Sequence, residues 1–420
     1  MKKMDKNPFK LIEFGVVASV GALALIGAST LIGHAKRAKQ TRIQHDTPEY
    51  SDESLEYSDE KIQALIKEGY IPIATAEELN SIRNTSPRFY GVGTKWKNTY
   101  KGGLDKKYVQ VANIDLSEYG DWTPIGTLHA NFRGTYDGGN YVITGLKIKG
   151  KDNDYQGLFG RTEEATISNV ALEDVNVTGA KYVGGLVGYA AEKTEISNSY
   201  ATGTVTGKAQ VGGLVGGAEN SMIINSYTEG TITGINQVGG LVGLAYDDTE
   251  INNSYSTCSA TGSGVYVGGL VGYVYYSATI SKSYATGAVK GIKEVGGLVG
   301  YIQSSAINSS YATGAVTGAS NVGGLVGVTL DSTINSSYAT GLVTGNKQVG
   351  GLVGYVARRT RVYNSYWDKE TTERTYSSGV GMGKSTEEMK NADTYSAWDT
   401  DVWNIVNGEY PTLISNPERH

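Results

Sequence analysis

A short pattern of hydrophobic residues and glycines repeats along most of the chain. The motif Gly-Gly-Leu-Val-Gly, each time preceded by Val, occurs seven times, beginning at Gly184, Gly212, Gly239, Gly268, Gly296, Gly323 and Gly350. Successive copies lie 27 to 29 residues apart, and a degenerate copy at 156–160 lies 28 residues before the first. A fixed period of this length indicates a repeat architecture in which each unit stacks on its neighbours.

Two further features recur with the same period. A Ser-Tyr pair with a β-branched residue four positions before the tyrosine occurs once per repeat, at Tyr200, Tyr227, Tyr255, Tyr284, Tyr311, Tyr338 and Tyr366. A third short segment follows each tyrosine, such as Ala-Thr-Gly-Thr-Val-Thr-Gly at 201–207. Each unit therefore has three β-compatible stretches separated by Gly or polar corners. Its Ile, Thr, Val and Gly residues disfavour a helix.

This pattern predicts an all-β fold, a right-handed parallel β-helix of about eight coils of 27–28 residues. Equivalent residues then stack about 4.8 Å apart. We expect Val, Leu, Ile and some tyrosines to fill the interior, although the alternation does not decide which face the tyrosine column takes. The main alternative is a β-propeller, which usually needs about 40 residues and four strands per blade.

The regions beside the repeats are expected to cover the open ends of the stack, which would otherwise pair with another chain. We predict a polar linker with a short helix at 36–70, an N-terminal cap at 71–150, the repeats at 151–366 and a C-terminal cap at 367–420. A capping box at 385–388 predicts a short helix in the C-terminal cap. Trp398 and Trp403 are expected to plug the last coil.

The first 35 residues have a different character. Residues 14–33 carry no charge, and this segment is long enough to form a hydrophobic α-helix that spans a membrane. Lys and Arg flank this segment on both sides, so the charges do not set an orientation. One interpretation is an uncleaved anchor, and another is a secretory signal cut after a small residue such as Ala28 or Ala35.

The composition restricts the chemistry that the chain can perform. It has 420 residues, with 57 Gly, 30 Tyr, 4 His, one Cys and a net charge of −5. The negative charge argues against nucleic-acid binding, and the few Cys and His argue against the common metal sites. The chain has no nucleophile elbow and no phosphate loop. We therefore predict a protein with no catalytic residues, no metal and no cofactor.

The variable corners of the repeats are the candidate binding residues. Length varies only at two corners, and the corner after each Gly-rich motif changes most in chemistry. Stacked corners would form a ridge along one side of the β-helix, and tyrosines with mixed charge suit protein or glycan contacts. The alternative is a solvated edge without a ligand. The candidate residues are Tyr246, Tyr275, Tyr276, Arg358 and Arg359.

The repeats resemble the GLUG motif family, which occurs in large bacterial surface and secreted proteins, including adhesin-like proteins and the non-catalytic parts of immunoglobulin-A peptidases. Residues 73–80, 111–116, 122–126 and 132–140 are similar to the segment that usually introduces the repeats, and residues 366–370 and 410–413 to the closing segment. The resemblance implies a non-catalytic β-solenoid at the cell surface, held in the membrane by its N-terminal helix. Its expected role is adhesion or surface interaction, with a surface protein or glycan as the ligand.

The N-terminus also resembles a type IV pilin. The similarity rests on residues 9–13, Phe-Lys-Leu-Ile-Glu, followed by an apolar stretch. In that family a short leader is removed before the Phe, here Phe9, and the Glu, here Glu13, helps to pack subunits into a filament. The family normally has Gly before the cut, and this chain has Pro8. The resemblance implies an alternative role, a pilin-like subunit that self-assembles into an extracellular filament and displays the solenoid outside.

Overall fold

The computed structural model describes residues 59–83 and 103–416. Phe9, Glu13 and the uncharged segment 14–33 lie outside the described residues, as does the linker up to residue 58. No helix in the described part of the chain is long and apolar enough to cross a membrane. The helices are α2 (Asp59–Lys67), α3 (Ala76–Ser81), η2 (Gly103–Asp105), α4 (Thr386–Met389) and η3 (Ala392–Tyr395).

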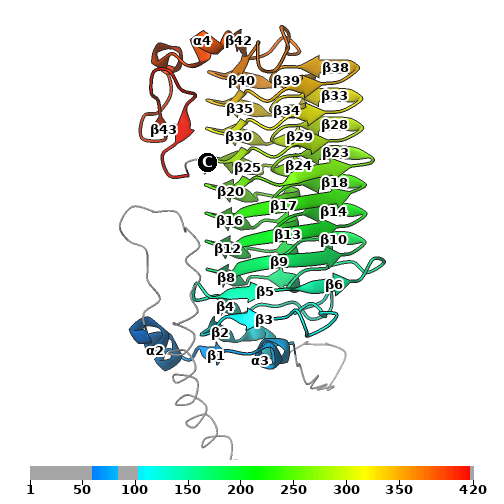
Figure 1. The fold of residues 1–420 in the computed structure, drawn as a ribbon, viewed down its shortest axis with the longest axis vertical. Helices are drawn as coiled ribbons and strands as arrows, with labels where there is room; N and C mark the ends of the chain where they lie inside the picture. The colour runs from blue at the N-terminus through cyan, green and yellow to red at the C-terminus, as the bar shows by residue number, and fades with distance from the viewer. Residues whose placement is uncertain (1–58, 84–102, 417–420) are drawn as a thin grey trace, which may run out of the picture. The chain divides into compact units, whose positions relative to one another are not determined.

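The strands stack turn upon turn into four parallel sheets (Figure 1). The first sheet is β1 (Ile71–Ile73), β2 (Lys107–Gln110), β4 (Thr135–Asp137), β8 (Thr166–Ser168), β12 (Glu195–Ser197), β16 (Met222–Ile224), β20 (Glu250–Asn252), β25 (Thr279–Ser281), β30 (Ala306–Asn308), β35 (Thr333–Asn335) and β40 (Arg361–Tyr363). The second sheet is β10 (Lys181–Val183), β14 (Ala209–Gly212), β18 (Asn236–Gly239), β23 (Val265–Gly268), β28 (Lys293–Gly296), β33 (Ser320–Gly323) and β38 (Lys347–Gly350).

The other two sheets complete each turn. The third sheet is β7 (Phe159–Glu163), β11 (Val187–Ala191), β15 (Val215–Glu219), β19 (Val242–Tyr246), β24 (Val271–Tyr275), β29 (Val299–Gln303), β34 (Val326–Leu330) and β39 (Val353–Arg358). The fourth sheet is β3 (Ile114–Asp115), β5 (Val142–Thr144), β6 (Lys147–Lys149), β9 (Ala171–Thr178), β13 (Tyr200–Thr206), β17 (Tyr227–Gly234), β21 (Tyr255–Ser256), β22 (Ser259–Gly262), β26 (Tyr284–Ala285), β27 (Val289–Lys290), β31 (Tyr311–Ala312), β32 (Val316–Thr317), β36 (Tyr338–Ala339), β37 (Val343–Thr344), β41 (Tyr366–Asp368) and β42 (Met382–Lys384).

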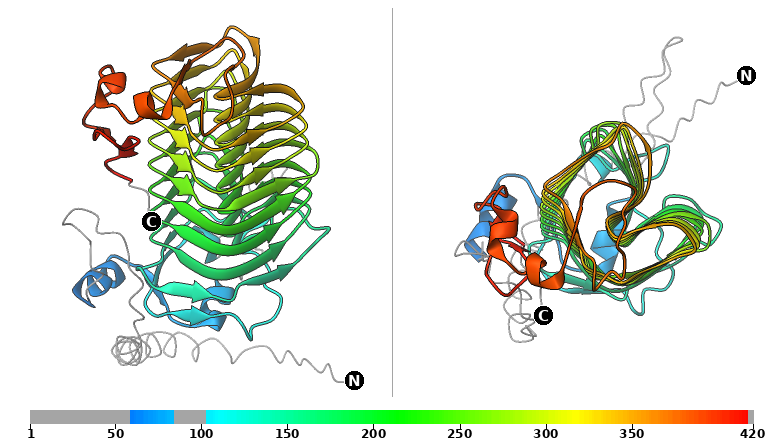
Figure 2. Two further views of the ribbon diagram at one scale, coloured as in Figure 1. Left: turned by 45° about the horizontal axis from the view of Figure 1, so that its top comes forward. Right: turned by 90° about the horizontal axis from the view of Figure 1, so that it is seen from above.

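Equivalent residues of successive repeats stack in register, which confirms the predicted parallel β-helix. In the first sheet Ile223 pairs with Ile196 on one side and Ile251 on the other. In the third sheet Val242 pairs in the same way with Val215 and Val271. All of these residues are buried in one continuous apolar interior. The eight strands of the third sheet match the eight coils expected from the sequence, and the turns superpose when seen along the axis (Figure 2).

The last glycine of each motif permits a close approach of two backbones. At Gly243, a Cβ atom would lie 2.4 Å from the backbone nitrogen of Val211 and 2.5 Å from the carbonyl carbon of Gln210. Gly272 faces Gln237 and Val238 of an earlier turn in the same way. The third sheet therefore folds in against the second sheet at a corner where only glycine fits.

The serine before each tyrosine forms a hydrogen-bonded ladder at another corner. The Oγ of Ser226 accepts from the backbone N–H of Ser199 at 3.2 Å and donates to the carbonyl of Ile224 at 2.8 Å. Ser254 and Ser283 repeat this pattern in the next turns. These buried hydroxyls satisfy backbone groups at a bend between two sheets, which explains why serine recurs there.

The N-terminal region extends the stack. Strands β1, β2 and β4, from the segment predicted as a cap at 71–150, pair in parallel below β8 and continue the first sheet. The short helix α3 follows β1 and begins at Thr75, whose side chain accepts a hydrogen bond from the backbone N–H of Glu78 at 3.2 Å. This segment therefore covers the end of the repeats by adding turns of its own to the first sheet.

The tyrosine column lies on the outside of the fourth sheet, a side that the sequence pattern left open. The tyrosines that help to fill the interior, as expected for some of them, are Tyr108 and Tyr136. In four repeats the residue after the tyrosine is an alanine of the interior, such as Ala312, whereas Tyr311 belongs to a separate apolar cluster. Its ring stacks on those of Tyr284 and Tyr338, with centroids 4.9 Å apart in both pairs. Because side chains alternate along a strand, the buried alanine forces the tyrosine outward.

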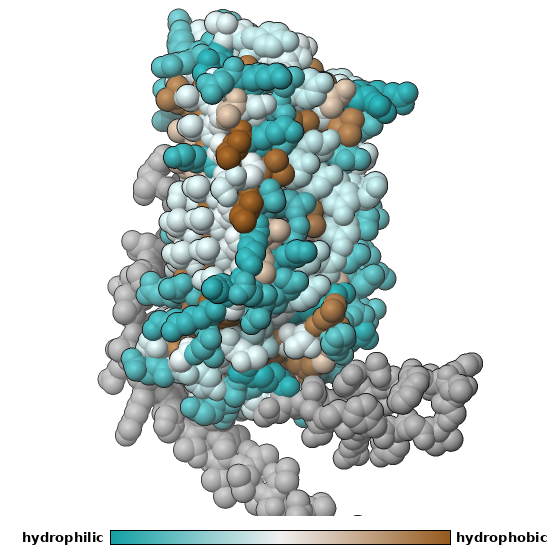
Figure 3. Space-filling view, turned by 90° about the vertical axis from the view of Figure 1, so that its right-hand side faces the viewer, coloured by the Kyte–Doolittle hydropathy of each residue, from teal (hydrophilic) through white to brown (hydrophobic). Residues whose placement is uncertain are grey.

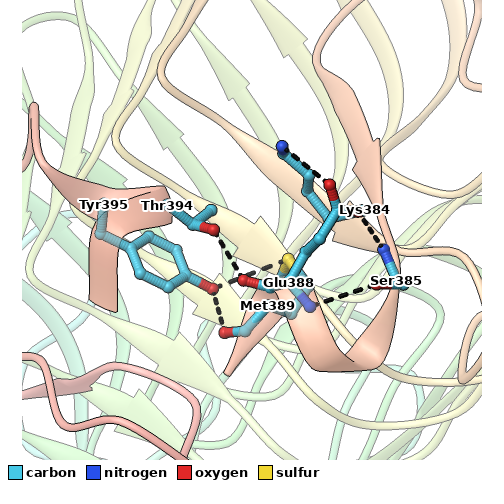
Figure 4. A network of polar contacts seen from close by, with 6 residues as sticks. All are labelled: Lys384, Ser385, Glu388, Met389, Thr394 and Tyr395. Carbon is cyan, nitrogen blue, oxygen red and sulfur yellow. Dashed lines mark hydrogen bonds and ion pairs between the residues drawn. The ribbon is translucent and has the colours of Figure 1, made fainter. Parts of the chain in front are cut away.

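The C-terminal residues 385–416, which we call the C-terminal strap, turn back along the side of the stack (Figures 1 and 2). They pack there on the tyrosine column. The strap contains α4, η3 and the antiparallel pair β43 (Trp403–Asn404) and β44 (Thr412–Leu413). Its first helix has the predicted capping box, in which Ser385 and Glu388 bond each other's backbone N–H groups at 2.8 and 3.1 Å (Figure 4).

The two strap tryptophans do not plug the last coil, which corrects the prediction from sequence. Trp403 packs 6.0 Å from the rings of Tyr311 and Tyr338, and Trp398 packs 5.9 Å from Tyr366. The outward tyrosines give the strap an apolar surface to cover. Trp367 instead enters the interior at the end of the stack, where its indole nitrogen donates to the carbonyl of Arg374 at 2.9 Å.

Candidate functional site

A continuous strip of tyrosines lies over the third sheet and over the corner where the second sheet leads into it. We call this strip the tyrosine face. Its members are Tyr155, Tyr182, Tyr189, Tyr246, Tyr266, Tyr273, Tyr275, Tyr276 and Tyr301. They follow the six turns from β7 to β29, which is a length of roughly 24 Å at the usual strand spacing.

Ring contacts join one end of the tyrosine face. The Tyr155 and Tyr182 rings stack with centroids 5.1 Å apart, and the Tyr189 ring meets Tyr182 edge-on at 4.9 Å. Gly217 occupies the next position along the third sheet, and a Cβ there would lie 2.9 Å from Tyr182 and 3.0 Å from Tyr189. The missing side chain therefore leaves the space that these two rings fill.

The strip continues through hydroxyl and ring contacts. The Tyr189 hydroxyl is hydrogen-bonded to the Tyr246 hydroxyl, and Tyr246 stacks on Tyr275 with centroids 5.0 Å apart. Tyr275 contacts Tyr276 at 4.7 Å and Tyr273 at 4.9 Å. Tyr276 is 55% exposed, so this part of the strip presents aromatic surface to solvent.

Tyr266, Tyr273 and Tyr301 form the other end of the strip. The Tyr301 ring meets Tyr266 and Tyr273 edge-on, each with centroids 5.2 Å apart. In the strand that carries Tyr273, Val271 and Val274 point into the interior. The two inward valines are three positions apart, so both Tyr273 and Tyr275 remain outside the interior.

The strands of the second sheet, and the equivalent position before β7, have an unusual backbone just before the corner with the third sheet. One residue per turn adopts a left-handed conformation there, with φ between 50° and 64°, and we call this set the junction column. It consists of Tyr155, Tyr182, Gln210, Gln237, Tyr266, Glu294, Asn321 and Gln348. A left-handed conformation costs most residues about 1–2 kcal/mol, and Gly or Asn adopt it more easily.

A second left-handed corner of the same turns shows the expected composition. It is occupied by Asn169, Asn198, Asn225, Asn253, Lys282, Ser309, Ser336 and Asn364. Asn and Ser predominate there, whereas tyrosine, glutamine and glutamate predominate in the junction column. The long side chains of the junction column are therefore carried on a backbone conformation that costs free energy.

The polar members of the junction column also bond along the stack. The amide of Gln210 donates to the amide oxygen of Gln237 in the next turn. Glu294 is buried, and its Oε1 accepts from Asn321 at 3.3 Å and from Lys293 at 2.8 Å. Its Oε2 is also buried and has no hydrogen-bond partner among residues 59–83 and 103–416. The corner thus holds amide and carboxylate groups beside the tyrosine rings.

Burial keeps several hydroxyls of the tyrosine face uncharged. Burial raises the pKa of Tyr189, and its hydrogen bond to the carboxylate of Glu219 raises it further. Burial likewise raises the pKa values of Tyr182, Tyr246 and Tyr273. These hydroxyls therefore remain protonated and serve as neutral hydrogen-bond donors and acceptors.

The structure brings three of the five candidate residues together. Tyr246, Tyr275 and Tyr276 are neighbours in the tyrosine face. Arg358 lies in the same column of the third sheet as Tyr275, three strands further along through Gln303 and Leu330. Arg359 follows it at an exposed corner.

The position of Arg358 and Arg359 also has a structural explanation. Arg358 ends β39 and Arg359 follows it, and β39 and β40 are the last strands of the third and first sheets. Arg361 is a third exposed arginine in this turn. Charged side chains at the open edge of a sheet hinder pairing with another chain, so these arginines suit protection of the edge.

Six tyrosines of the strip were missed from sequence. A signal for them exists, because tyrosine recurs directly after the glycine motif, at Tyr189, Tyr273 and Tyr301. It recurs again just before the valine that precedes the motif, at Tyr182 and Tyr266. In the stretches that the structure describes, no three His, Cys, Asp or Glu side chains gather into a group that could hold a metal ion.

The fold and its repeats define a β-solenoid built from one recurring motif. Residues 179–206, 207–233 and 263–290 match the GLUG motif, so the chain carries GLUG motif repeats. A protein of Evansella cellulosilytica, described as a candidate Gly-rich membrane protein, is 34% identical over 131 residues. That match covers 29% of this chain and 13% of the length of the relative.

Two solved structures are also similar, at 19% sequence identity in both cases. One is described as a candidate immunoglobulin A1 protease from Bacteroides ovatus, with a TM-score of 0.44 over 83% of this chain and 93% of that chain. The other is described as an IgA1 protease, with a TM-score of 0.45 over 81% of this chain and 25% of that chain.

Proposed function

We propose that this protein is a non-catalytic β-solenoid of the bacterial cell surface that mediates adhesion or surface interaction through the tyrosine face. The observation that carries the proposal is the unbroken contact between nine tyrosines over six turns. Tyrosine offers a large rigid apolar area together with a hydroxyl group, and it is enriched in binding interfaces for this reason. The rings lie on a continuously hydrogen-bonded solenoid, so a ligand meets a surface that is already organised.

The proposed location at the cell surface rests on separate grounds. Residues 14–33 are uncharged and long enough to hold the chain in a membrane. The relative from Evansella cellulosilytica is named as a membrane protein. GLUG motif repeats of the kind found here suit a domain displayed outside such an anchor.

The full chain, fluorescently labelled, can be tested for binding to a glycan array and to fixed epithelial cells. We expect binding to at least one of these, and we expect the double variant Tyr275→Ala and Tyr276→Ala to weaken it about tenfold or more, as loss of a central aromatic pair does at interfaces. The matched control is Tyr363→Ala, because Tyr363 is 51% exposed on the first sheet, away from the tyrosine face. Equal binding by the double variant and the control would refute a role for the tyrosine face.

A further inference from the structure

An open pocket of about 330 Å³ lies next to the first tyrosine of the tyrosine face. It is formed by the loop at 121–128, between β3 and β4, and by residues 148–156, which run from the end of β6 into the loop before β7. Tyr155 lines this pocket and also stacks on Tyr182. The pocket and the tyrosine face therefore share a residue and form one continuous surface.

We propose that this pocket binds a neutral sugar residue of a glycan whose remaining residues lie along the tyrosine face. The proposal deepens the proposed function, on which it rests, by naming the class of ligand. The volume is at the small end of the range for ligand pockets, about 300–1,000 Å³, which suits one sugar ring or two.

The polar lining suits a ligand rich in hydroxyl groups. Oδ1 of Asp121 accepts from the backbone N–H of Lys149 at 2.8 Å, and Oδ1 of Asp154 accepts from the backbone N–H of Lys181 at 3.0 Å. Each carboxylate is thus held in place by one oxygen, and its second oxygen can accept from a sugar hydroxyl. Asn153, in the same lining, adds an amide that can donate to a hydroxyl oxygen.

Burial and hydrogen bonds hold several residues of the pocket lining in place. Gln156 is 6% exposed, and its amide nitrogen donates to the carbonyl of Asp154 at 2.6 Å. Trp122 is also buried, with its indole nitrogen donating to the carbonyl of Leu158 at 3.2 Å. The guanidinium of Arg83 lies over the Trp122 ring at 4.8 Å. These contacts hold the lining in place before a ligand arrives, so little ordering is needed on binding.

The charges and apolar groups of the lining narrow the class of sugar. Among residues 59–83 and 103–416, two carboxylates and no Lys or Arg line the pocket, so an acidic sugar would meet repulsion from them. Pro124 and Leu128, together with Tyr155, supply apolar surface in the lining for the C–H face of a sugar ring. A neutral hexose or N-acetylhexosamine combines these two kinds of surface.

The test uses the full chain and calorimetric titration with glucose, galactose, mannose, N-acetylglucosamine, N-acetylneuraminic acid and butylamine. We expect at least one of the four neutral sugars to bind, and neither of the charged probes to bind more tightly. The double variant Asp121→Asn and Asp154→Asn keeps an oxygen for both backbone N–H groups but loses both charges. It should weaken sugar binding about tenfold or more, because hydrogen bonds to a charged group are the strong ones.

The matched control is Asp152→Asn. Asp152 lies on the same loop but outside the lining, and it pairs with Lys208 at 2.8 Å. Absence of binding by all four neutral sugars, tighter binding of butylamine, or equal sugar binding by the double variant and the control would each overturn the proposal. If the Tyr275 and Tyr276 variant loses cell binding while the Asp121 and Asp154 variant retains it, the pocket proposal fails and the proposed function stands.

Discussion

The hydroxyl of Tyr410 donates a hydrogen bond of 2.6 Å to Oδ2 of Asp368 and so joins the C-terminal strap to β41. Asp368 is fully buried and also accepts from Oγ1 of Thr386 at 2.7 Å. The backbone N–H groups of Glu370 and Thr371 bond its other oxygen at 2.8 and 3.1 Å. One carboxylate therefore holds both ends of the strap and the turn that follows the last repeat.

Replacing this carboxylate should loosen the strap. Asp368→Ala leaves four donors without their acceptor, and we expect the free energy of unfolding to fall by about 3 kcal/mol. Chemical denaturation measures this loss, and limited proteolysis should cut the strap faster in the variant than in the wild type. Asp401→Ala, at an exposed position in the strap, is the control and should change little. Wild-type stability of the Asp368 variant would show that the strap is held by its tryptophans alone.

The carboxylate of Asp368 should also make the stability of the protein depend on pH in the acid range. Burial by itself would raise the pKa of Asp368, but the hydrogen bonds from Tyr410, Thr386 and the two backbone N–H groups outweigh it and lower the pKa. The ionised form is thus favoured in the folded state. Its contribution is present above the unfolded pKa of about 3.9 and is lost as the pH falls towards the lower folded value.

Unfolding free energies measured from about pH 6 down to about pH 2 should therefore decline less steeply in Asp368→Ala than in the wild type. The control Asp401→Ala should keep the wild-type slope. Parallel curves for Asp368→Ala and the wild type would contradict a lowered pKa at this site.

The outer tyrosine ladder should contribute to stability mainly where the strap covers it. Tyr311 is fully buried between Tyr284, Tyr338 and Trp403, so Tyr311→Ala should cost about 3–5 kcal/mol, as is usual for a buried aromatic residue. Tyr200 has a ladder neighbour, Tyr227, but is only partly buried. Tyr200→Ala is the matched variant and should cost clearly less in urea denaturation. Equal losses would mean that the strap adds nothing to the ladder.

The sequence predicted the interior of the solenoid well and its exterior poorly. Columns such as Ile223 and Ile251 could be predicted because strict periodicity and burial go together. The sequence could not predict whether Tyr311 faces the interior or the outside, since the alternation is interrupted at the glycines and tyrosine suits either side. The position of Trp403 could not be predicted either, because the strap packs on the apolar surface that the outward tyrosines form.

The candidate site could be predicted only in part for a related reason. Tyr246, Tyr275 and Tyr276 stand out because the corners vary between repeats. Tyr273 was missed because the step of three between the inward residues Val271 and Val274 departs from strand alternation. The pocket beside Tyr155 depends on two separate segments, 121–128 and 148–156, and no local sequence pattern marks them.

The glycine that ends each motif should tolerate no side chain. Gly243→Ala places a Cβ 2.4 Å from the backbone nitrogen of Val211, and backbone cannot move aside as a side chain can. We expect a loss of about 3 kcal/mol or more, in the range for overpacked sites. Gly217→Ala is the matched variant, since its Cβ would meet only the rings of Tyr182 and Tyr189 at 2.9 and 3.0 Å. The Gly217→Ala variant should retain most of the wild-type stability. Thermal unfolding of both variants tests whether Gly243→Ala is the less stable of the two.

The tyrosine face should make the protein sensitive to alkali. Burial raises the pKa of Tyr189, and its bond to Glu219 adds to this, so the neutral hydroxyl is favoured in the folded state. The resulting stability is full below the unfolded pKa of about 10 and is lost as the pH rises through the higher folded value.

Ligand binding should accordingly be constant between about pH 6 and about pH 9. Above that range, the ultraviolet absorbance of tyrosinate from buried rings such as Tyr189 should appear only as the protein unfolds. Tyr189→Phe keeps the ring but removes the titrating hydroxyl, so its unfolding free energy should fall less steeply with alkali than that of the wild type. Tyr376→Phe is the control, and a slope in Tyr189→Phe as steep as in this control would contradict the raised pKa.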